Sequence, residues 1–220
     1  MIQLKNITKS FSQSDSKNIL YENMDFEVKS WEFIAIVWRS GSGKSTILNL
    51  ISGLLSPNSG EIHVDNQEIT KLSQDEMTKT RGKNMSFIFQ QFHLIPNLTV
   101  SENITLPIEI NKIQPAFSTQ QILKKVWLSE KSESYPYELS WWEQQRVAVA
   151  RAFAAQTNIL LADEPTGNLD EKNAKNVMDI LSLLHKETKN TIVLITHDMQ
   201  VAQYADKIYT LENKQLILKK

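Results

Sequence analysis

The amino-acid sequence predicts an α/β fold with a mainly parallel central sheet. Short runs of β-branched residues alternate with longer stretches of helical periodicity, as expected of consecutive βα units. Four of the short runs are almost continuously apolar, which is typical of strands that are covered on both faces. These four expected strands are residues 33–37, 85–89, 158–162 and 191–195.

Two accessory regions are expected around this sheet. The first is an antiparallel subdomain, whose strands are residues 2–7, 24–28 and 61–64. The second is helical, because residues 97–137 contain Pro107 and Pro115 and show helical periodicity at residues 120–128. We expect this inserted helical lobe to extend over about residues 97–155.

The length and composition place the chain among ordinary globular proteins. Its 220 residues suit a single domain, residues 1–220. A hydrophobic fraction of 41% and a charged fraction of 22% exclude disorder, collagen and coiled coil. The absence of cysteine excludes a disulfide framework and a thiolate metal site. The 24 basic and 25 acidic residues create no overall field toward nucleic acid, so we expect no nucleic-acid partner.

No targeting segment is recognised in the sequence. The N-terminus has neither a basic head with an apolar run nor a small-residue cleavage site. The longest apolar runs fall far short of the roughly 18 residues that a membrane span requires. We therefore expect a cytosolic chain that is linked to a membrane only through a partner.

A phosphate-binding loop is indicated directly after the run at residues 33–37. Residues 38–46 read Trp-Arg-Ser-Gly-Ser-Gly-Lys-Ser-Thr and precede a helical run, which is the context of a nucleotide P-loop. Its backbone N–H groups would surround the β-phosphate, Lys44 would neutralise phosphate charge, and Ser45 would ligate Mg²⁺. A serine- and glycine-rich turn that caps a helix is the alternative interpretation. The candidates are Trp38, Arg39, Ser40, Gly41, Ser42, Gly43, Lys44, Ser45 and Thr46.

Two carboxylates follow another of the expected strands. Residues 159–165 form an apolar run that ends in Asp163, Glu164 and a proline. At the carboxyl edge of a sheet, this arrangement places an Asp against Mg²⁺ and a Glu next to an attacking water. Asp163 is therefore a candidate metal ligand and Glu164 a candidate catalytic residue. An isolated pair of this kind would more often lie in a solvated loop, and the P-loop upstream favours the catalytic interpretation.

A third motif carries a family resemblance. Residues 139–146, Leu-Ser-Trp-Trp-Glu-Gln-Gln-Arg, resemble the signature sequence Leu-Ser-Gly-Gly-Glu-Gln-Gln-Arg of the ATPase domain of ABC transporters. The resemblance covers essentially the whole chain and implies the P-loop NTPase fold, with ATP and Mg²⁺ as ligands. Residues 92–100 and 163–170 are similar to the branch that includes lipoprotein-releasing and macrolide- or peptide-exporting ATPases.

The resemblance also implies roles for residues elsewhere in the chain. Gln90 matches the glutamine that senses the metal and contacts the transmembrane partner. His197 matches the switch histidine, which would hold Glu164 and the γ-phosphate in register. Phe11 takes the place of the aromatic residue that stacks on adenine, and Asp170 belongs to a loop at the dimer interface. The implied metal ligands are Ser45, Gln90 and Asp163.

The mechanism implied by the resemblance is that of a head-to-tail dimer with two ATP molecules between its subunits. Each site takes its P-loop from one copy and its signature segment from the other. The helix that follows Ser140 would direct its N-terminus at the γ-phosphate. The signature candidates are Ser140, Trp141, Trp142 and Glu143. The implied partners are a second copy of this chain and a transmembrane permease, at the cytoplasmic face of the membrane.

Two other classes of function stay open. A soluble ABC-type protein of translation or DNA repair usually carries two ATPase domains or a long coiled-coil insertion, whereas this sequence has one P-loop and no heptad run. A degenerate or regulatory subunit would bind ATP without hydrolysing it. A permease gene next to the gene of this chain would favour transport, and the permease would select the substrate.

All five tryptophans stand where the family has glycine. The chain has 6 glycines, whereas average usage predicts about 15 in a chain of this length. Trp38, Trp141 and Trp142 lie in the ATP-binding motifs, and Trp31 and Trp127 lie elsewhere. We hypothesise that UGA codons for glycine have been translated as tryptophan. Real tryptophans in a degenerate homologue and deliberate engineering are the competing accounts.

Overall fold

Two sheets organise the part of the chain that the structure, a computed structural model, describes. The described residues are 2–13, 16–37 and 44–220, and their described side chains are 2–11, 18–37 and 46–220. The larger sheet has six strands in the order β10-β9-β3-β8-β7-β6, of which only β10 runs antiparallel to its neighbour. Its strands are β3 (Phe33–Val37), β6 (Met85–Phe89), β7 (Ile159–Asp163), β8 (Thr191–Thr196), β9 (Lys207–Glu212) and β10 (Gln215–Leu218). The predicted parallel sheet is therefore confirmed.

The central strands are covered on both faces, which explains their continuous apolar runs. Along β3, Phe33 and Ala35 belong to one buried cluster, whereas Ile34 and Ile36 belong to another. The first cluster includes apolar residues of the helices α5 (Trp141–Ala154) and α6 (Glu171–Thr188). The second joins the sheet to α1 (Lys44–Ile51) and to the antiparallel sheet. Each strand therefore stabilises two layers, and a polar residue at any of these positions would be buried.

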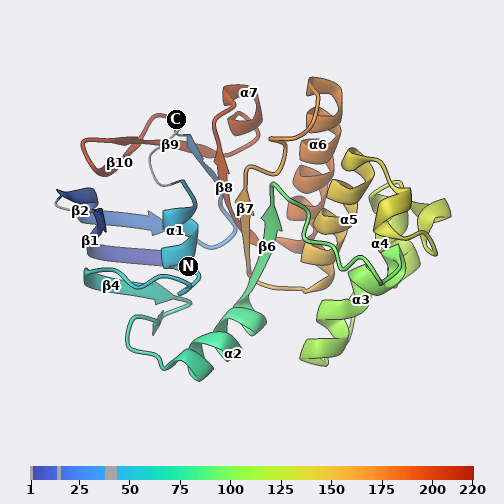
Figure 1. Cartoon of the computed structure of the whole chain (residues 1–220), viewed down its shortest axis with the longest axis horizontal. Coiled ribbons are helices and arrows are strands. Elements are labelled where there is room, and N and C mark those ends of the chain that lie inside the picture. Colours follow the sequence, from blue (N-terminus) through green and yellow to red (C-terminus); the bar gives the residue numbers. More distant parts are fainter. Residues whose placement is uncertain (1, 14–15, 38–43) are drawn as a thin grey trace.

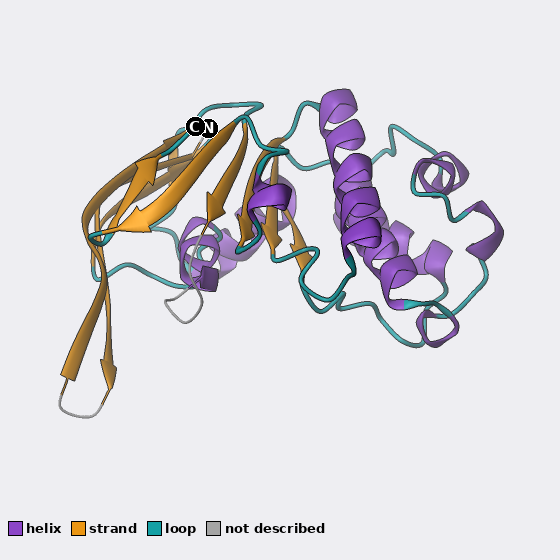
Figure 2. Cartoon of the chain, turned by 90° about the horizontal axis from the view of Figure 1, so that it is seen from above, coloured by secondary structure: helices purple, strands orange, loops and turns teal. Residues whose placement is uncertain are grey.

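The second sheet is antiparallel, with the strand order β2-β1-β4-β5. Its strands are β1 (Ile2–Gln13), β2 (Ser16–Val28), β4 (Ser59–Val64) and β5 (Gln67–Glu68). The predicted strands at residues 2–7, 24–28 and 61–64 lie within it, but β1 and β2 continue well beyond their predicted ends. Figure 2 shows these continuations as a hairpin arm that projects from the sheet.

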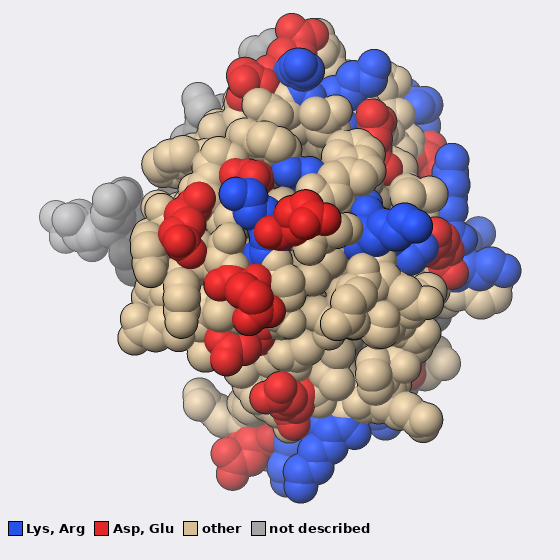
Figure 3. All heavy atoms as spheres, turned by 90° about the vertical axis from the view of Figure 1, so that its right-hand side faces the viewer, with Lys and Arg blue, Asp and Glu red and all other residues tan. Residues whose placement is uncertain are grey.

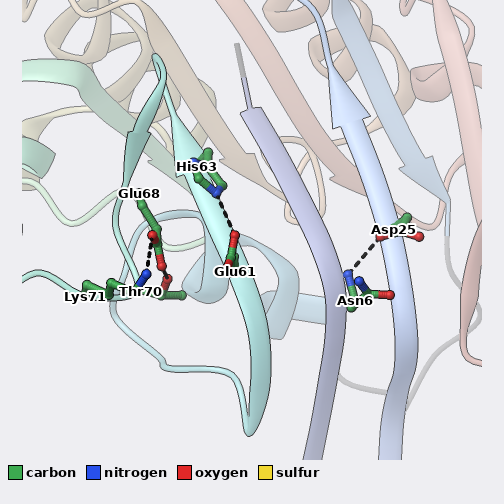
Figure 4. Close-up of polar contacts among 7 residues, drawn as sticks. All are labelled: Asn6, Asp25, Glu61, His63, Glu68, Thr70 and Lys71. Atoms are coloured by element: carbon green, nitrogen blue, oxygen red, sulfur yellow. Dashed lines mark hydrogen bonds and ion pairs between the residues drawn. The ribbon is translucent and has the colours of Figure 1, made fainter.

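The pairing of β1 with β2 is interrupted by a bulge at Asn6. Asn6 has a left-handed backbone, with φ 52°, and the pairing register shifts between Leu4 and Ile7. The Asn6 N–H, which is turned out of the ladder, donates to Asp25 Oδ1 at 2.8 Å (Figure 4). Asparagine suits this position because it tolerates the left-handed region better than most residues do.

Polar side chains also meet where β4 and β5 pair. His63 lies opposite Glu68 in the register, and His63 Nε2 is 3.2 Å from Glu61 Oε2 (Figure 4). The three side chains offer ligand atoms within 4.8 Å of one another. Glu68, however, already accepts a hydrogen bond from Lys71 Nζ at 2.8 Å, which holds the pKa of this carboxyl below its ordinary value. Lys71 thus already neutralises one of the two carboxylates at this edge.

The other helices lie mainly on the side of the central sheet away from the antiparallel sheet (Figure 1). Between β6 and β7 lie α3 (Val100–Asn111), α4 (Thr119–Lys125), the 3₁₀ turns Ser129–Lys131 and Pro136–Glu138, and α5. This stretch corresponds to the predicted helical lobe, whose limits within a single domain stay a prediction. Outside it are α2 (Gln74–Asn84) and α7 (Met199–Ala202). Figure 3 shows acidic and basic side chains interspersed over this end of the molecule.

Capping boxes fix where three of these helices begin. In each, a serine or threonine accepts from the backbone N–H three residues later, and the acidic or amide side chain at that position accepts from the cap backbone. The pairs are Ser73 with Glu76, Thr99 with Glu102, and Ser118 with Gln121. The starts of α2, α3 and α4 are therefore set by local sequence.

Asn103 of α3 holds the segment that leads into this helix. Its side chain is 0% exposed. Its Oδ1 accepts from Ile95 N at 2.8 Å, and its Nδ2 donates to the carbonyls of Ile95, Leu98 and Thr99 at 3.0–3.1 Å. One buried amide thus contacts four backbone groups between β6 and α3, two of which, the Ile95 and Thr99 carbonyls, also accept from backbone N–H groups.

We predict that Asn103→Ala lowers the free energy of unfolding by about 3 kcal/mol, because Ile95 N and the Leu98 carbonyl lose the hydrogen bonds of a fully buried amide. Urea denaturation monitored by circular dichroism measures this change. Asn111→Ala is the matched control, since Asn111 is an exposed asparagine of the same helix, whose side chain donates to the Pro107 carbonyl at 3.1 Å. We expect the control to change stability by less than about 1 kcal/mol. Equal effects of the two variants would contradict the role given to Asn103.

Candidate functional site

The parallel strands bring distant parts of the chain to one edge of the central sheet. Because β6, β7, β8 and β3 pair in register, Phe89 lies opposite Asp163 and Val37 lies opposite Thr196. The residues that follow these strand ends are Gln90, Glu164 and His197. The chain that leaves β3 enters α1 at Lys44. Candidates from four separate motifs therefore converge at the carboxyl edge, where ligands bind in open α/β sheets.

Glu164 and His197 make a short polar contact at this edge. His197 Nδ1 lies 2.6 Å from Glu164 Oε2, although the residues are 33 positions apart. Glu164 is only 6% exposed, whereas His197 is exposed. The Glu164 backbone is left-handed, with φ 47°, and its N–H donates to the Ile195 carbonyl at 2.9 Å. The Glu164 backbone is thus fixed by its hydrogen bond to β8, and its buried carboxylate contacts an imidazole that is exposed to solvent.

The phosphate-loop candidates lie mostly outside the described residues. These are Trp38, Arg39, Ser40, Gly41, Ser42 and Gly43, together with the side chains of Lys44 and Ser45. The structure does describe α1 beginning at Lys44, and it places Thr46 in the buried first turn. The described strand β3 and helix α1 flank the loop as a P-loop requires.

A second contact joins the segment after β6 to the turn that follows Glu164. Gln90 Nε2 donates to Asn168 Oδ1 at 3.2 Å, and Asn168 Nδ2 donates to the Gln90 carbonyl at 3.1 Å. Asp163 lies half-buried at the end of β7. Asp170 caps α6, since its Oδ1 accepts from Asn173 N at 2.8 Å. Sequence reasoning gave Asn168 no role, because its contacts depend on the conformation of this turn.

The signature segment forms the N-terminus of α5. Ser140 is the cap residue, and both its N–H and its Oγ donate to Glu143 Oε2, at 2.8 and 2.5 Å. Partial burial raises the pKa of Glu143, but the hydrogen bonds from Ser140 outweigh this effect and hold the pKa below its ordinary value. Trp141 is 63% exposed, and the Trp142 ring stacks on the Arg146 guanidinium, whose carbon is 4.0 Å from the ring centroid. Indole rings therefore occupy the surface of this helix start.

Phe11 lies in the hairpin arm of the antiparallel sheet, whereas Glu164 and His197 follow strands of the central sheet. It pairs with Asn18 across the arm, and its ring is exposed. Lys9 Nζ lies 5.2 Å from the ring centroid. A cation over the ring is compatible with a platform for a planar ligand, and the adenine contact stays a prediction.

Trp31 and Trp127 occupy backbone positions that favour glycine. Trp31 has φ 67° and is the third residue of a turn closed by a hydrogen bond from Glu32 N to the Lys29 carbonyl. A positive φ at this position usually requires glycine. Trp127 has φ 56° directly after α4. The two side chains are 66% and 58% exposed, so packing in the described core does not explain why a bulky residue adopts these angles.

The turn at Trp127 is a Schellman motif. Leu128 N donates to the Leu123 carbonyl at 2.9 Å, and Trp127 N donates to the Lys124 carbonyl at 3.2 Å. These are the two bonds of the motif, in which the left-handed residue is usually glycine. Arg146 Nη1 donates to the Trp127 carbonyl and so links this turn to α5.

An open groove lies between the segment after β6 and the start of α5. Its volume is about 670 Å³, and its apolar lining includes Phe92, Leu94, Tyr137 and Trp141. Tyr137 is 76% exposed, and the Phe92 and Trp141 rings meet edge to face with centroids 5.6 Å apart. Such an exposed aromatic groove is typical of a surface that a partner covers.

Comparison with known proteins gives a consistent picture. A family model described as "ABC transporter" matches residues 21–167. An uncharacterized ABC transporter ATP-binding protein of Methanocaldococcus jannaschii is 41% identical and spans 98% of this chain and 95% of its own length. The bacitracin export ATP-binding protein BceA of Halalkalibacterium halodurans is 35% identical over 98% of this chain and 87% of its own length. The macrolide export ATP-binding/permease protein MacB of Pasteurella multocida is 37% identical over 99% of this chain, which matches 34% of that protein.

Solved structures support the same assignment. The dimeric structure of a post-hydrolysis state of an ATP-binding cassette, bound to ADP and Pi, superposes with a TM-score of 0.88 at 38% identity. The match covers 100% of this chain and 98% of that chain. No helix in the described part of the present chain has the length and apolar character of a membrane span.

We predict that Trp127→Gly raises the free energy of unfolding by about 0.5–1 kcal/mol, because the relief of left-handed strain exceeds the entropy that glycine costs. We expect the same direction for Trp31→Gly. Urea denaturation measures both changes. Trp142→Gly is the matched comparison: its position lies inside α5, so glycine should lower stability by about 1 kcal/mol. A loss of stability at positions 31 and 127 would contradict the interpretation of their backbone.

Proposed function

Because this chain belongs to the ABC transporter family, we propose that Glu164 and His197 form the catalytic pair of its ATPase. The chain is the ATP-binding subunit of a transporter, a member of an ATPase family that uses Mg²⁺, assembles as a dimer of cassettes and works with a membrane permease. The observation that carries the residue assignment is the 2.6 Å contact between His197 Nδ1 and Glu164 Oε2 at the carboxyl edge of the parallel sheet.

The geometry of this pair suits the activation of water. A carboxylate at this edge accepts a hydrogen bond from water and makes the water oxygen more nucleophilic toward the γ-phosphorus. As the new P–O bond forms, the bond from the γ-phosphorus to the bridging oxygen breaks, and ADP leaves with the electron pair. His197 contacts the Glu164 carboxylate through Nδ1, so its Nε2 faces away from this carboxylate; with both ring nitrogens protonated, Nε2 would donate to the γ-phosphate.

The residues around this pair fit a magnesium ion. Asp163 and Gln90 end neighbouring strands and carry oxygen ligands of the kind that Mg²⁺ prefers. Ser45 lies in the first turn of α1, although its side chain is outside the described residues. Bound Mg²⁺ would neutralise charge on the β- and γ-phosphates. Lys44 and the backbone of residues 38–43 would hold the same phosphates from the other side.

A second copy of the chain completes the site. The cap residue Ser140 and the N-terminus of α5 would face the γ-phosphate bound by the partner copy, where the helix dipole stabilises developing negative charge. In the described chain the Ser140 hydroxyl donates to Glu143, so it would have to turn toward the nucleotide. Asp170 would lie at the same interface.

We further propose that the active form of this chain has glycine at positions 31, 38, 127, 141 and 142, encoded by UGA. The left-handed turns at Trp31 and Trp127 support glycine at two of these positions. At the start of α5, two indoles would keep the signature backbone away from the partner's γ-phosphate. A UGG codon at any of these positions would refute the proposal for that residue.

The two indole rings at the start of α5 favour one alternative function. If Trp141 and Trp142 are encoded as tryptophan, the chain would bind ATP without closing the signature segment over it. Such a chain would be a regulatory subunit that tethers a permease. Its gene would carry UGG codons, and its dimer would not tighten with ATP.

The aromatic groove is the proposed docking site for a segment of the permease. Its lining begins at Gln91, the residue after Gln90. A permease segment in the groove would therefore contact this chain next to the proposed metal ligand. We place the chain at the cytoplasmic face of the membrane, where ATP is available. We propose export as the transport direction, as in the names of two relatives, whereas a third relative is named a putative hemin import protein.

We predict that the chain as written hydrolyses ATP negligibly, and that the variant with glycine at all five positions turns over. Phosphate release under saturating Mg²⁺ and ATP measures both rates. In the glycine variant, Glu164→Gln should reduce kcat by at least about 100-fold, because the water loses its acceptor, while ATP binding persists.

Glu171→Gln is the control for this experiment. Glu171 is an exposed carboxylate in the first turn of α6, and we expect its substitution to leave kcat within twofold. Comparable rates for the written chain and the glycine variant, or for Glu164→Gln and its parent, would contradict the proposal.

We predict that Tyr137→Asp weakens binding to the permease encoded by a neighbouring gene by about tenfold, because an exposed aromatic in a groove is a common interface anchor. Affinity for the detergent-solubilised permease measures the effect, and ATPase activity of the isolated glycine variant should not change. Leu183→Asp is the control, since Leu183 is 48% exposed on α6 outside the groove. Unchanged permease affinity in Tyr137→Asp would exclude this groove as the docking site.

A further inference from the structure

Gln90 and Asn168 form a reciprocal pair of amides. Gln90 Nε2 donates to Asn168 Oδ1 at 3.2 Å, and Asn168 Nδ2 donates to the Gln90 backbone carbonyl at 3.1 Å. The residues are 78 positions apart, one directly after β6 and the other in the turn between Glu164 and α6. The Asn168 amide therefore contacts both the side chain and the backbone of Gln90.

This pairing fixes the orientation of both amide groups. A backbone carbonyl only accepts hydrogen bonds, so Asn168 must present its Nδ2 to the Gln90 carbonyl. Asn168 Oδ1 then faces the Gln90 side chain. Because an amide oxygen only accepts hydrogen bonds, the donor from Gln90 must be Nε2. Gln90 Oε1 takes no part in this pair and is consequently available to bind a cation, while one Nε2 hydrogen is held by Asn168. The assignment follows from the donor and acceptor chemistry of one backbone group.

The turn that carries Asn168 is itself fixed. Gly167 N donates to the Glu164 carbonyl at 3.0 Å, and Leu169 N donates to the Thr166 carbonyl at 3.0 Å. A Cβ at Gly167 would lie 2.9 Å from Gln90 Nε2, so only glycine leaves the amide its present place without a shift. The position of Asn168 is thus set by the same short segment that presents Glu164.

We propose that Asn168 is a positioning residue that turns the Gln90 amide so that oxygen, and not N–H, faces the nucleotide-bound Mg²⁺. A cation is bound by an amide oxygen and repelled by an amide N–H, so an inverted Gln90 could not serve as a ligand. Asn168 thereby couples the turn after Glu164 to the metal ligand after β6. The inference rests on the proposed role of Gln90 and deepens it.

The contact itself can be tested without nucleotide. In ¹⁵N-labelled chain, the Gln90 side-chain amide signals are identified by their loss in Gln90→Glu. We expect nuclear Overhauser contacts from these protons to Asn168, and collapse of their shifts toward random-coil values in Asn168→Ala. Absence of these contacts in the unsubstituted chain would overturn the inference at its first step.

A double-mutant cycle tests the effect on metal binding. Mn²⁺ binding in the presence of ATP is measured by electron paramagnetic resonance in the variant with glycine at the five tryptophan positions. Asn168→Ala should weaken Mn²⁺ binding by about three- to tenfold, the range that corresponds to one amide hydrogen bond. In a Gln90→Glu background, Asn168→Ala should not weaken it, because both oxygens of a carboxylate can ligate. Asn173→Ala, in the same part of the chain, is the control and should stay within twofold of its parent.

The outcomes separate this inference from the proposed function. Equal weakening in the Gln90 and Gln90→Glu backgrounds would show that Asn168 acts only structurally, and no weakening in either would show that amide orientation does not matter. Both results would overturn the inference while leaving the proposed ATPase intact. A parent that binds no Mn²⁺ with ATP would overturn the proposed function, and the inference with it.

Discussion

In-register pairing of parallel strands is the constraint on which the candidate site depends. Residues that are far apart in the chain meet only because β6, β7 and β8 end at the same level of the sheet. A slip of one residue in any strand would turn its side chains to the opposite face and carry them out of the site. The hydrogen bond from Glu164 N to the Ile195 carbonyl extends this ladder by one residue. The left-handed backbone then turns the chain, so that the carboxylate meets His197.

The helical lobe is attached to this edge through backbone carbonyls. Gln145 Nε2 donates to the Phe89 carbonyl at 3.4 Å, and the Arg151 guanidinium donates to the carbonyls of Phe92 and His93 at 2.9 and 2.6 Å. Both side chains come from α5, the helix that begins with the signature segment. A displacement of α5 therefore moves the segment after Gln90 as well. The aromatic groove, the signature segment and the proposed metal ligand are consequently parts of one hydrogen-bonded unit.

The sequence predicted those strands whose two faces are both buried. The buried strands were recognisable because both faces are covered, which leaves no polar residue to interrupt the apolar run. The hairpin arm, the two-residue β5 and the β9–β10 pair show no continuous apolar run. These strands are short, rich in polar residues or located at an edge of a sheet. The helical periodicity at residues 120–128 overran α4, which ends at Lys125 because the Schellman motif closes there.

The candidate site was predictable only in part. Glu164 and His197 came from motifs and resemblance, but their contact depends on strand order, which neither motif encodes. Asn103 and Asn168 were missed for a different physical reason. Both amides bind backbone carbonyls of irregular segments, and no side-chain pattern in the sequence marks such a contact.

The left-handed turn at residue 31 has a consequence for producing this protein. It connects β2 to β3, so the first of the five proposed UGA codons precedes every strand of the central sheet. A host that reads UGA as stop would release a peptide of 30 residues, containing β1 and β2 but neither the predicted phosphate loop nor the proposed catalytic carboxylate. Such a fragment has no second layer against which to bury its apolar face and would be degraded. Recombinant work on this chain therefore calls for a synthetic gene with conventional glycine codons at these five places.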